Sequence, residues 1–344
     1  MEYDARSEWN ALACRPDYKF ERPDRHVGGC YCDRLNSSSI PPIVQVTDPE
    51  SGATVSASLP LVATAAASTS ITSVQFYIDG VALGAPLTAP PYIVYWNTLT
   101  VSGGQHVITA SATDSGGRIG TSAPVTVTVD NSRPPSTIGK EVTVSADGTN
   151  VLQTPPFSTT AAGELLVAFV AYDGPAGLPQ TATVNGAGLI WTLLKRSNVQ
   201  SGTAEIWAAK SIDPLTNVTV ISQPAIGTNY NGSLTVIAFT NASGPGVVGQ
   251  SSAPSGAPEI YLPGVSAGNW AFAVGNDWDN AITRMPVSGQ VLVHQRIDTQ
   301  VGDTYWVQST AAPSTADGLV DIHDTSPTAE RWNYAAVEIV ATRQ

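Results

Sequence analysis

The sequence predicts an all-β protein built from two β-sandwiches, the second larger than the first. Valine and threonine recur throughout the chain, and their branched side chains favour pleated, half-buried structure. The 30 glycines and 25 prolines divide the chain into short segments. No segment has the periodicity of an amphipathic helix. A length of 344 residues is typical of two or three domains.

The charge of the chain argues against several functions. Charged residues make up 13% of the sequence, and the formal net charge is −12. Nucleic acids and anionic membrane surfaces both require a basic protein surface, so we expect neither as a partner. No apolar run approaches the ~20 residues that span a bilayer, so membrane insertion is not expected. The segment Met1–Arg6 has neither the basic nor the apolar region of a secretory signal.

Residues 1–39 differ from the rest and are predicted to form an irregular leader. They contain thirteen of the 44 charged residues and all three cysteines, Cys14, Cys30 and Cys32. One disulfide with one cysteine left over, free thiols, or no role at all remain open. A zinc cluster with His26 is the less favoured alternative, because zinc ligands are usually spaced as C-x₂-C rather than C-x-C.

Residues 41–130 are predicted to form the first sandwich. Short alternating segments are separated by turn signals such as Asp79-Gly80 and Ser102-Gly103-Gly104, which is the pattern of a seven-strand sandwich. Several phrases resemble bacterial Ig-like modules of secreted and surface proteins, over about 43–129: Thr47-Asp48-Pro49, Val74-Gln75-Phe76-Tyr77-Ile78-Asp79-Gly80, Trp96, Gly104-Gln105-His106 and Ala112-Thr113-Asp114. The resemblance implies an Ig-like β-sandwich that serves as a spacer or adhesive module.

Residues 131–137 are predicted to be a linker, because Pro134 and Pro135 remove hydrogen-bond donors from any ladder. Residues 138–344 follow as one larger, jelly-roll-type β-sandwich of about twelve strands. Phrases such as Gly163-Glu164-Leu165-Leu166-Val167 and Gly275–Asn280 resemble a carboxy-terminal module of secreted proteins of soil bacteria. That resemblance implies an extracellular context and supplies no catalytic residue.

The segment Gly275–Asn280 is the strongest candidate for a binding loop. It follows an alternating strand, Trp270–Val274, and it places Trp278 between Asp277 and Asp279. Paired carboxylates act as acid and base in glycoside hydrolysis, bind calcium together with Asn oxygens, or hydrogen-bond sugar hydroxyls beside a stacking indole. The alternative is an Asx-rich turn that caps loop amides.

Further polar and aromatic residues of the second sandwich extend this candidate site. His294 and His323, with Asp324, would suit a metal site if their strands were neighbours, but no metal-binding spacing supports it, and no metal site is predicted. Trp306 and Trp332 each stand beside polar residues; the alternative for both is a buried indole. The predicted ligand-binding residues are Asp277, Trp278, Asp279, His294, Trp306, His323 and Trp332.

These observations favour an extracellular or cell-surface protein that binds a polysaccharide or surface glycan without catalysis. The first alternative is a glycoside hydrolase or polysaccharide lyase that uses Asp277, Asp279 or Asp324. The second is a structural subunit of a surface appendage or virion fibre. The nucleophile elbow, the phosphate-binding loop and the dinucleotide fingerprint are all absent from the sequence. No cofactor is expected, apart from calcium at the paired aspartates.

Overall fold

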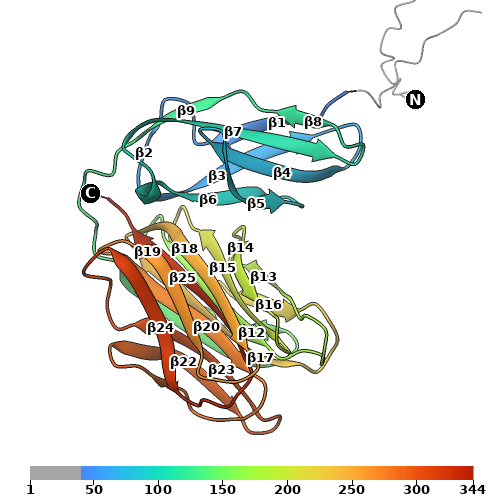
Figure 1. Ribbon diagram of the computed structural model, residues 1–344, viewed down its shortest axis with the longest axis vertical. Helices are drawn as coiled ribbons and strands as arrows, with labels where there is room; N and C mark the ends of the chain where they lie inside the picture. Colours follow the sequence, from blue (N-terminus) through green and yellow to red (C-terminus); the bar gives the residue numbers. More distant parts are fainter. Residues whose placement is uncertain (1–39, 344) are drawn as a thin grey trace, which may run out of the picture.

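The computed structural model describes residues 40–343, and β-strands dominate this range. Its one helical turn is the 3₁₀ segment η2 (Thr98–Thr100). The Ig-like sandwich lies above a larger β-block in Figure 1. The predicted all-β class is confirmed. Among the described residues, no helix has the length and apolar character needed to cross a membrane.

The Ig-like sandwich consists of two facing sheets. One has the order β1-β3-β6, and the other has the order β2-β9-β7-β4-β5, with β8 paired to β7. Its core is built from alternate residues of these strands, including Phe76 and Trp96, as expected for strands with one buried face. The strands are β1 (Ile43–Asp48), β2 (Thr54–Val55), β3 (Ser58–Ala66), β4 (Ile71–Ile78), β5 (Val81–Leu87), β6 (Tyr92–Asn97), β7 (Gly104–Asp114), β8 (Ile119–Thr121) and β9 (Val125–Val129).

The larger block begins with an eight-stranded unit that we call the first jelly roll. Its first, eighth, third, sixth and fifth strands form one sheet, β10-β17-β12-β15-β14, and the others form β11-β16-β13. The strands are β10 (Gly139–Thr149), β11 (Leu152–Gln153), β12 (Leu165–Tyr172), β13 (Ala182–Gly186), β14 (Thr192–Ser197), β15 (Thr203–Lys210), β16 (Val220–Pro224) and β17 (Asn231–Thr240).

A second jelly roll repeats the same topology, with sheets β18-β25-β20-β23-β22 and β19-β24-β21. Even a register shift recurs, between Leu193 and Lys195 in the first unit and between Leu292 and His294 in the second. The structure thus resolves the single large sandwich expected from sequence into two units. The strands are β18 (Ala242–Ala253), β19 (Glu259–Val265), β20 (Trp270–Asp277), β21 (Met285–Pro286), β22 (Gln290–Asp298), β23 (Asp303–Thr310), β24 (Gly318–Ser326) and β25 (Trp332–Ala341).

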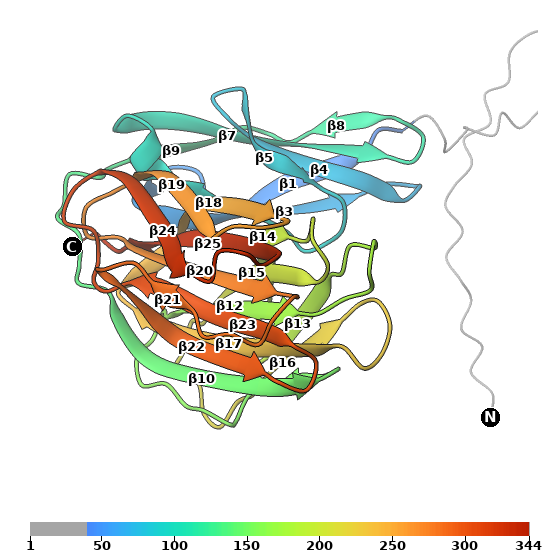
Figure 2. The ribbon, with the colours of Figure 1, turned by 60° about the horizontal axis from the view of Figure 1, so that its bottom comes forward.

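The two five-stranded sheets pack face to face, which gives the block four layers (Figure 2). A central hydrophobic cluster between them contains Phe169 and Phe239 from the first unit and Phe272 from the second. Each five-stranded sheet also packs its other face on its own three-stranded sheet. Both faces of β12 and β20 are therefore covered, and every residue of these strands is buried.

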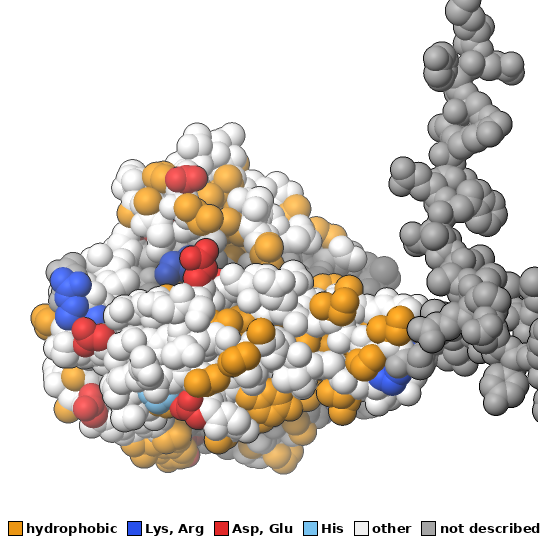
Figure 3. Space-filling model, turned by 90° about the horizontal axis from the view of Figure 1, so that it is seen from above, with side chains coloured by type: hydrophobic (Ala, Val, Ile, Leu, Met, Phe, Trp, Pro, Cys, Tyr) orange, Lys and Arg blue, Asp and Glu red, His pale blue; other side chains and the backbone are white. Residues whose placement is uncertain are grey.

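The Ig-like sandwich contacts the block through β18. The Ser58 amide donates to Ser243 Oγ at 3.1 Å, and Tyr95 packs against the central cluster. After Pro135 the chain already belongs to the block, because the Ser136 amide donates to the Thr342 carbonyl at 2.8 Å. The face seen in Figure 3 is mainly uncharged, with few charged side chains, in keeping with the composition.

Candidate functional site

The candidate loop after β20 begins with a buried ion pair. Asp277 is the last residue of β20 and is fully buried, and its carboxylate pairs with Arg284, which is equally buried. The Arg284 guanidinium carbon lies 4.2 Å from the centre of the Trp306 ring. Burial raises the pKa of Asp277 to about 6, although Arg284 opposes the shift. Asp277 is therefore held inside the protein.

Asp279 forms a second ion pair at the surface, with Arg331. The Arg331 amide donates to Oδ2 at 2.7 Å, and the guanidinium Nε donates to Oδ1 at 2.8 Å. The Arg331 hydrogen bond is the largest cause of a lowered pKa at Asp279, so this carboxyl is ionised at neutral pH. The Asp279 amide in turn donates to Asp277 Oδ1 at 2.8 Å, which is the capped loop that the sequence offered as the alternative to a ligand site.

These contacts correct the expected arrangement of catalytic carboxylates. Asp277 and Asp279 each have an arginine partner, and the side chain of Asp277 has no exposed surface. Asp324 is 2% exposed, and burial raises its pKa to about 7 against the opposing charge of Arg284. A polysaccharide cannot reach Asp277 or Asp324 in this conformation. Neither carboxyl group is accessible as a catalytic acid or base.

Two of the predicted ligand-binding tryptophans are part of the core. Trp306 is 1% exposed and Trp332 is 4% exposed, and both belong to the cluster between the sheets of the second jelly roll. Trp332 Nε1 donates to the Gly256 carbonyl at 2.8 Å. The expectation that these indoles face a ligand is wrong, because both faces of their sheet are covered.

The two histidines of the second jelly roll do not converge. His294 lies on β22 and faces the first jelly roll, where its Nε2 is 3.0 Å from Asp147 Oδ1. His323 lies on β24 in the other sheet, and its Nδ1 is 2.8 Å from Asp321 Oδ2. His294 thus joins the two units, and the condition for grouping both histidines with Asp324, that their strands be neighbours, is not met.

Trp278 differs from the other tryptophans in its surroundings. Of the seven tryptophans in the described residues, it alone belongs to none of the four hydrophobic clusters. It is partly exposed, and the Arg331 guanidinium carbon lies 4.7 Å from the centre of its ring. Its side chain also lies near Asp173, just after β12 in the first jelly roll, where it opposes the rise that burial causes in the pKa of that carboxyl.

A small cleft lies at the same end of the block. It has a volume of about 300 Å³ and is lined by residues 177–179 and 198–201 of the first jelly roll. Asn276 Nδ2 donates to the Ser201 carbonyl at 3.2 Å, and the Gln200 amide donates to Asn333 Oδ1 at 2.9 Å. A loop of the first jelly roll therefore contacts β20 and β25 of the second, beside the residues that lead to Trp278.

Arg284 was not singled out in the sequence, and Glu330 and Arg331 were considered only as polar neighbours of Trp332, yet all three organise this loop. Glu330 is buried and accepts a hydrogen bond from Asn280 Nδ2 at 2.7 Å. Its carboxylate lies near those of Asp277 and Asp279, in a group compact enough for one cation. The two arginines already supply positive charge there. Calcium binding at this loop stays a prediction.

The comparison with protein-family models agrees with the Ig-like sandwich. A family model described as a bacterial Ig domain matches residues 42–110, ending within β7. Fibronectin(III)-like modules of Clostridium thermocellum CbhA share 25% identity, covering 25% of this chain and 94% of theirs, with a TM-score of 0.24. The search of curated proteins gives no match.

A second solved structure covers more of the chain at lower identity. It is SGBP-B of the Bacteroides ovatus mixed-linkage glucan utilization locus, in complex with a mixed-linkage heptasaccharide. It shares 11% identity, covering 86% of this chain and 98% of that one, with a TM-score of 0.21. The resemblance of residues 42–110 to bacterial Ig-like modules is thus confirmed, and the expected relationship of the carboxy-terminal block stays a prediction.

Proposed function

We propose that this chain is an extracellular or cell-surface protein that binds a glycan without catalysis, through the loop that carries Trp278. The observation that carries the proposal is the position of Trp278 outside every hydrophobic cluster of the described residues. An indole that contributes to no core and remains partly exposed is available to stack on a sugar ring.

The groups around Trp278 suit a neutral ligand with many hydroxyl groups. Asp279 and Arg331 form a partly exposed ion pair, with 23% and 39% of their side-chain surfaces accessible, and both present hydrogen-bonding atoms beside the ring. The net charge of −12 disfavours an anionic polysaccharide, because like charges repel over the whole surface. A neutral polysaccharide is therefore the ligand class that we propose.

The enzymatic alternative has less support from the geometry. A retaining or inverting glycosidase needs two carboxyl groups that face the same sugar. Here Asp277 faces inward to Arg284, whereas Asp279 pairs with Arg331 at the surface. No particular residue supports the other alternative, a structural subunit of a surface appendage or virion fibre. Release of reducing sugar from a neutral polysaccharide by the wild-type protein would favour the enzyme instead.

The decisive experiment replaces the tryptophan. Trp278→Ala should reduce retention on a neutral polysaccharide by roughly fivefold, since aromatic stacking contributes about 1 kcal/mol beyond burial. Affinity electrophoresis in gels containing mixed-linkage glucan, xylan or cellulose derivatives measures this retention.

Trp207→Ala is the matched control, because Trp207 is also partly exposed but packs on the core of the first jelly roll. It should lower the melting temperature and leave retention of the folded protein unchanged. If Trp278→Ala leaves retention unchanged, or if it costs the 3–5 kcal/mol typical of a buried tryptophan, the proposed site is wrong.

A further inference from the structure

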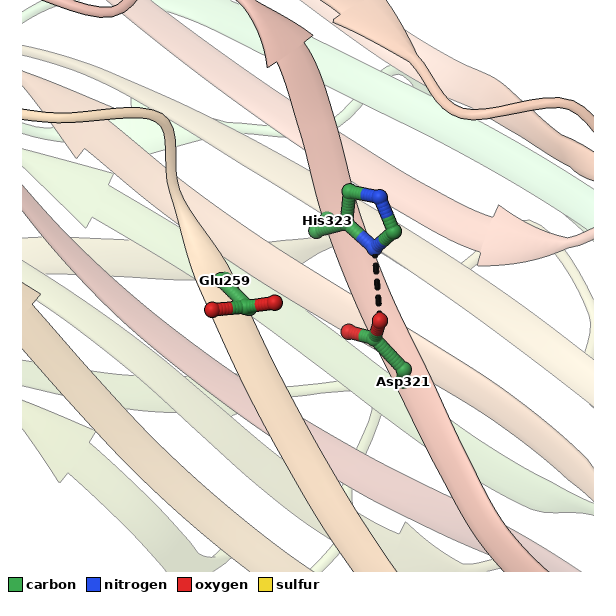
Figure 4. Close-up of side chains that lie close together, drawn as sticks. All are labelled: Glu259, Asp321 and His323. Carbon is green, nitrogen blue, oxygen red and sulfur yellow. Dashed lines mark ion pairs between the residues drawn. The ribbon is translucent and has the colours of Figure 1, made fainter.

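A second group of polar residues lies on the outer three-stranded sheet of the second jelly roll. Glu259 on β19 is the direct cross-strand partner of His323 on β24. Asp321 precedes His323 by two residues, so its side chain projects from the same face of the strand. One ligand atom from each of the three side chains lies within 4.8 Å of the others (Figure 4).

No lysine or arginine of the described residues pairs with the carboxylates of this group, Glu259 and Asp321. His323 Nδ1 lies 2.8 Å from Asp321 Oδ2, whereas Asp321 Oδ1 is shielded from solvent and has no hydrogen-bond partner among the described residues. A shielded carboxylate oxygen without a partner is costly, and a cation would satisfy it.

The strand that carries two of these residues is held from behind by glutamines. Gln290 Nε2 donates to the Asp321 carbonyl at 2.7 Å, and Gln290 Oε1 accepts from the His323 amide at 3.2 Å. Gln308 Nε2 donates to the His323 carbonyl at 3.1 Å. On the neighbouring strand, the Tyr261 hydroxyl donates to Glu259 Oε1 at 2.5 Å and leaves Oε2 for a ligand. These contacts hold the backbone of β24 at Asp321 and His323 and orient the Glu259 carboxylate.

We propose that Glu259, Asp321 and His323 bind a divalent transition-metal ion of the zinc type. One imidazole nitrogen with two carboxylate oxygens is a donor set that zinc accepts, and it leaves one position of a tetrahedral site for water. Calcium and magnesium prefer oxygen ligands alone, so the imidazole favours zinc. The site lies on the outer sheet and does not depend on glycan binding by the Trp278 loop.

The test must exclude zinc binding by the leader, which contains Cys14, Cys30, Cys32 and His26. The parent protein is therefore the full chain with the three cysteines changed to serine and His26→Gln. Isothermal titration of this parent with zinc chloride should give one binding site. His323→Gln and Asp321→Asn, each in the parent, should weaken zinc binding at least tenfold. Glu259→Gln, at an exposed position, provides a third variant.

The matched control is Asp79→Asn, because Asp79 lies 2.6 Å from His106 in a histidine–aspartate pair within the Ig-like sandwich. It should leave zinc affinity unchanged. Melting temperatures in the presence of a chelator should agree among the parent and the variants, which shows that each is folded. The proposal fails if the parent does not bind zinc, if it binds calcium in preference, or if His323→Gln binds zinc as the parent does.

Discussion

Asp303→Asn should stabilise the protein at alkaline pH, although it removes a buried charged residue. Asp303 begins β23 and is 2% exposed, and its Oδ2 accepts a hydrogen bond from the Tyr305 hydroxyl at 2.9 Å. Burial is the largest cause that raises its pKa to about 7, and the nearby charge of Asp173 raises it further. Asparagine keeps an acceptor for Tyr305 and carries no charge.

The sign and size of the effect follow from proton linkage. Because the pKa in the folded state lies above its usual 3.8, the folded protein holds this proton more tightly than the unfolded chain. The resulting stability is fully present below about pH 4 and is lost as the pH rises through 7. A shift of about 3 pKa units at about 1.4 kcal/mol per unit sets an upper limit on the order of 4 kcal/mol.

Urea unfolding at pH 5 and pH 8, followed by tryptophan fluorescence, measures this difference. The urea midpoint of the wild-type protein should be lower at pH 8 than at pH 5. Asp303→Asn should make this decrease smaller without abolishing it, because Asp277 and Asp324 also have raised pKa values. Asp147→Asn is a control in which loss of the carboxylate should have the opposite effect on stability. Burial raises the pKa of Asp147, but hydrogen bonds from His294 and Ser233 lower it overall, so the folded state favours the charged form. That variant should lose stability at pH 8. An Asp303→Asn protein destabilised equally at both pH values would refute the reasoning.

Two further predictions concern the buried ion pair and the linker. Arg284→Met should cost about 3–5 kcal/mol in urea unfolding, because it leaves the buried Asp277 carboxyl without its ion-pair partner. Arg331→Met at the partly exposed pair should cost at most about 1 kcal/mol, and equal costs would contradict this reasoning. Limited proteolysis should cut within residues 130–134 and release a fragment that begins before Pro135, since residue 136 already bonds to residue 342. First cuts within 138–343 would argue against the predicted domain boundary.

Sequence patterns predicted most of the strands and missed those with unusual composition. The sequence predicts about twelve strands in the larger block, and the structure has sixteen, among them the irregular edge strand β18. β18 contains Ser-Gly-Pro-Gly, which reads as a turn, yet it forms an edge strand with register shifts on either side of Pro245. Buried Glu338 supports this irregular strand by accepting a hydrogen bond from the Val247 amide at 2.9 Å. Glu338 lies 91 residues from Val247 in the sequence, so no pattern around β18 could predict this contact.

The stacking of the two jelly rolls did have a signal in the sequence. The strand Leu165–Tyr172 is apolar without alternation, which indicates a strand buried on both faces. A single sandwich with one solvated face does not require such a strand. The partners of the candidate loop had no comparable signal, because Arg331 reaches Asp279 only through the pairing of β20 with β25.

The two repeats differ at the position where the candidate loop begins. Tyr172 and Asp277 are equivalent, since each ends the third strand of its unit and forms the last pair with a threonine, Thr203 or Thr304. In the first unit the Tyr172 hydroxyl donates to the Ser222 carbonyl at 2.9 Å and the strand end is closed by an aromatic ring. In the second unit an ion pair with Arg284 replaces that ring. The residues that follow are Asp173 and Trp278, which contact each other across the stacked sheets. The same topology therefore ends its third strand with a buried aromatic ring in the first repeat and with a polar, aromatic loop in the second. We expect the second repeat to bind the ligand.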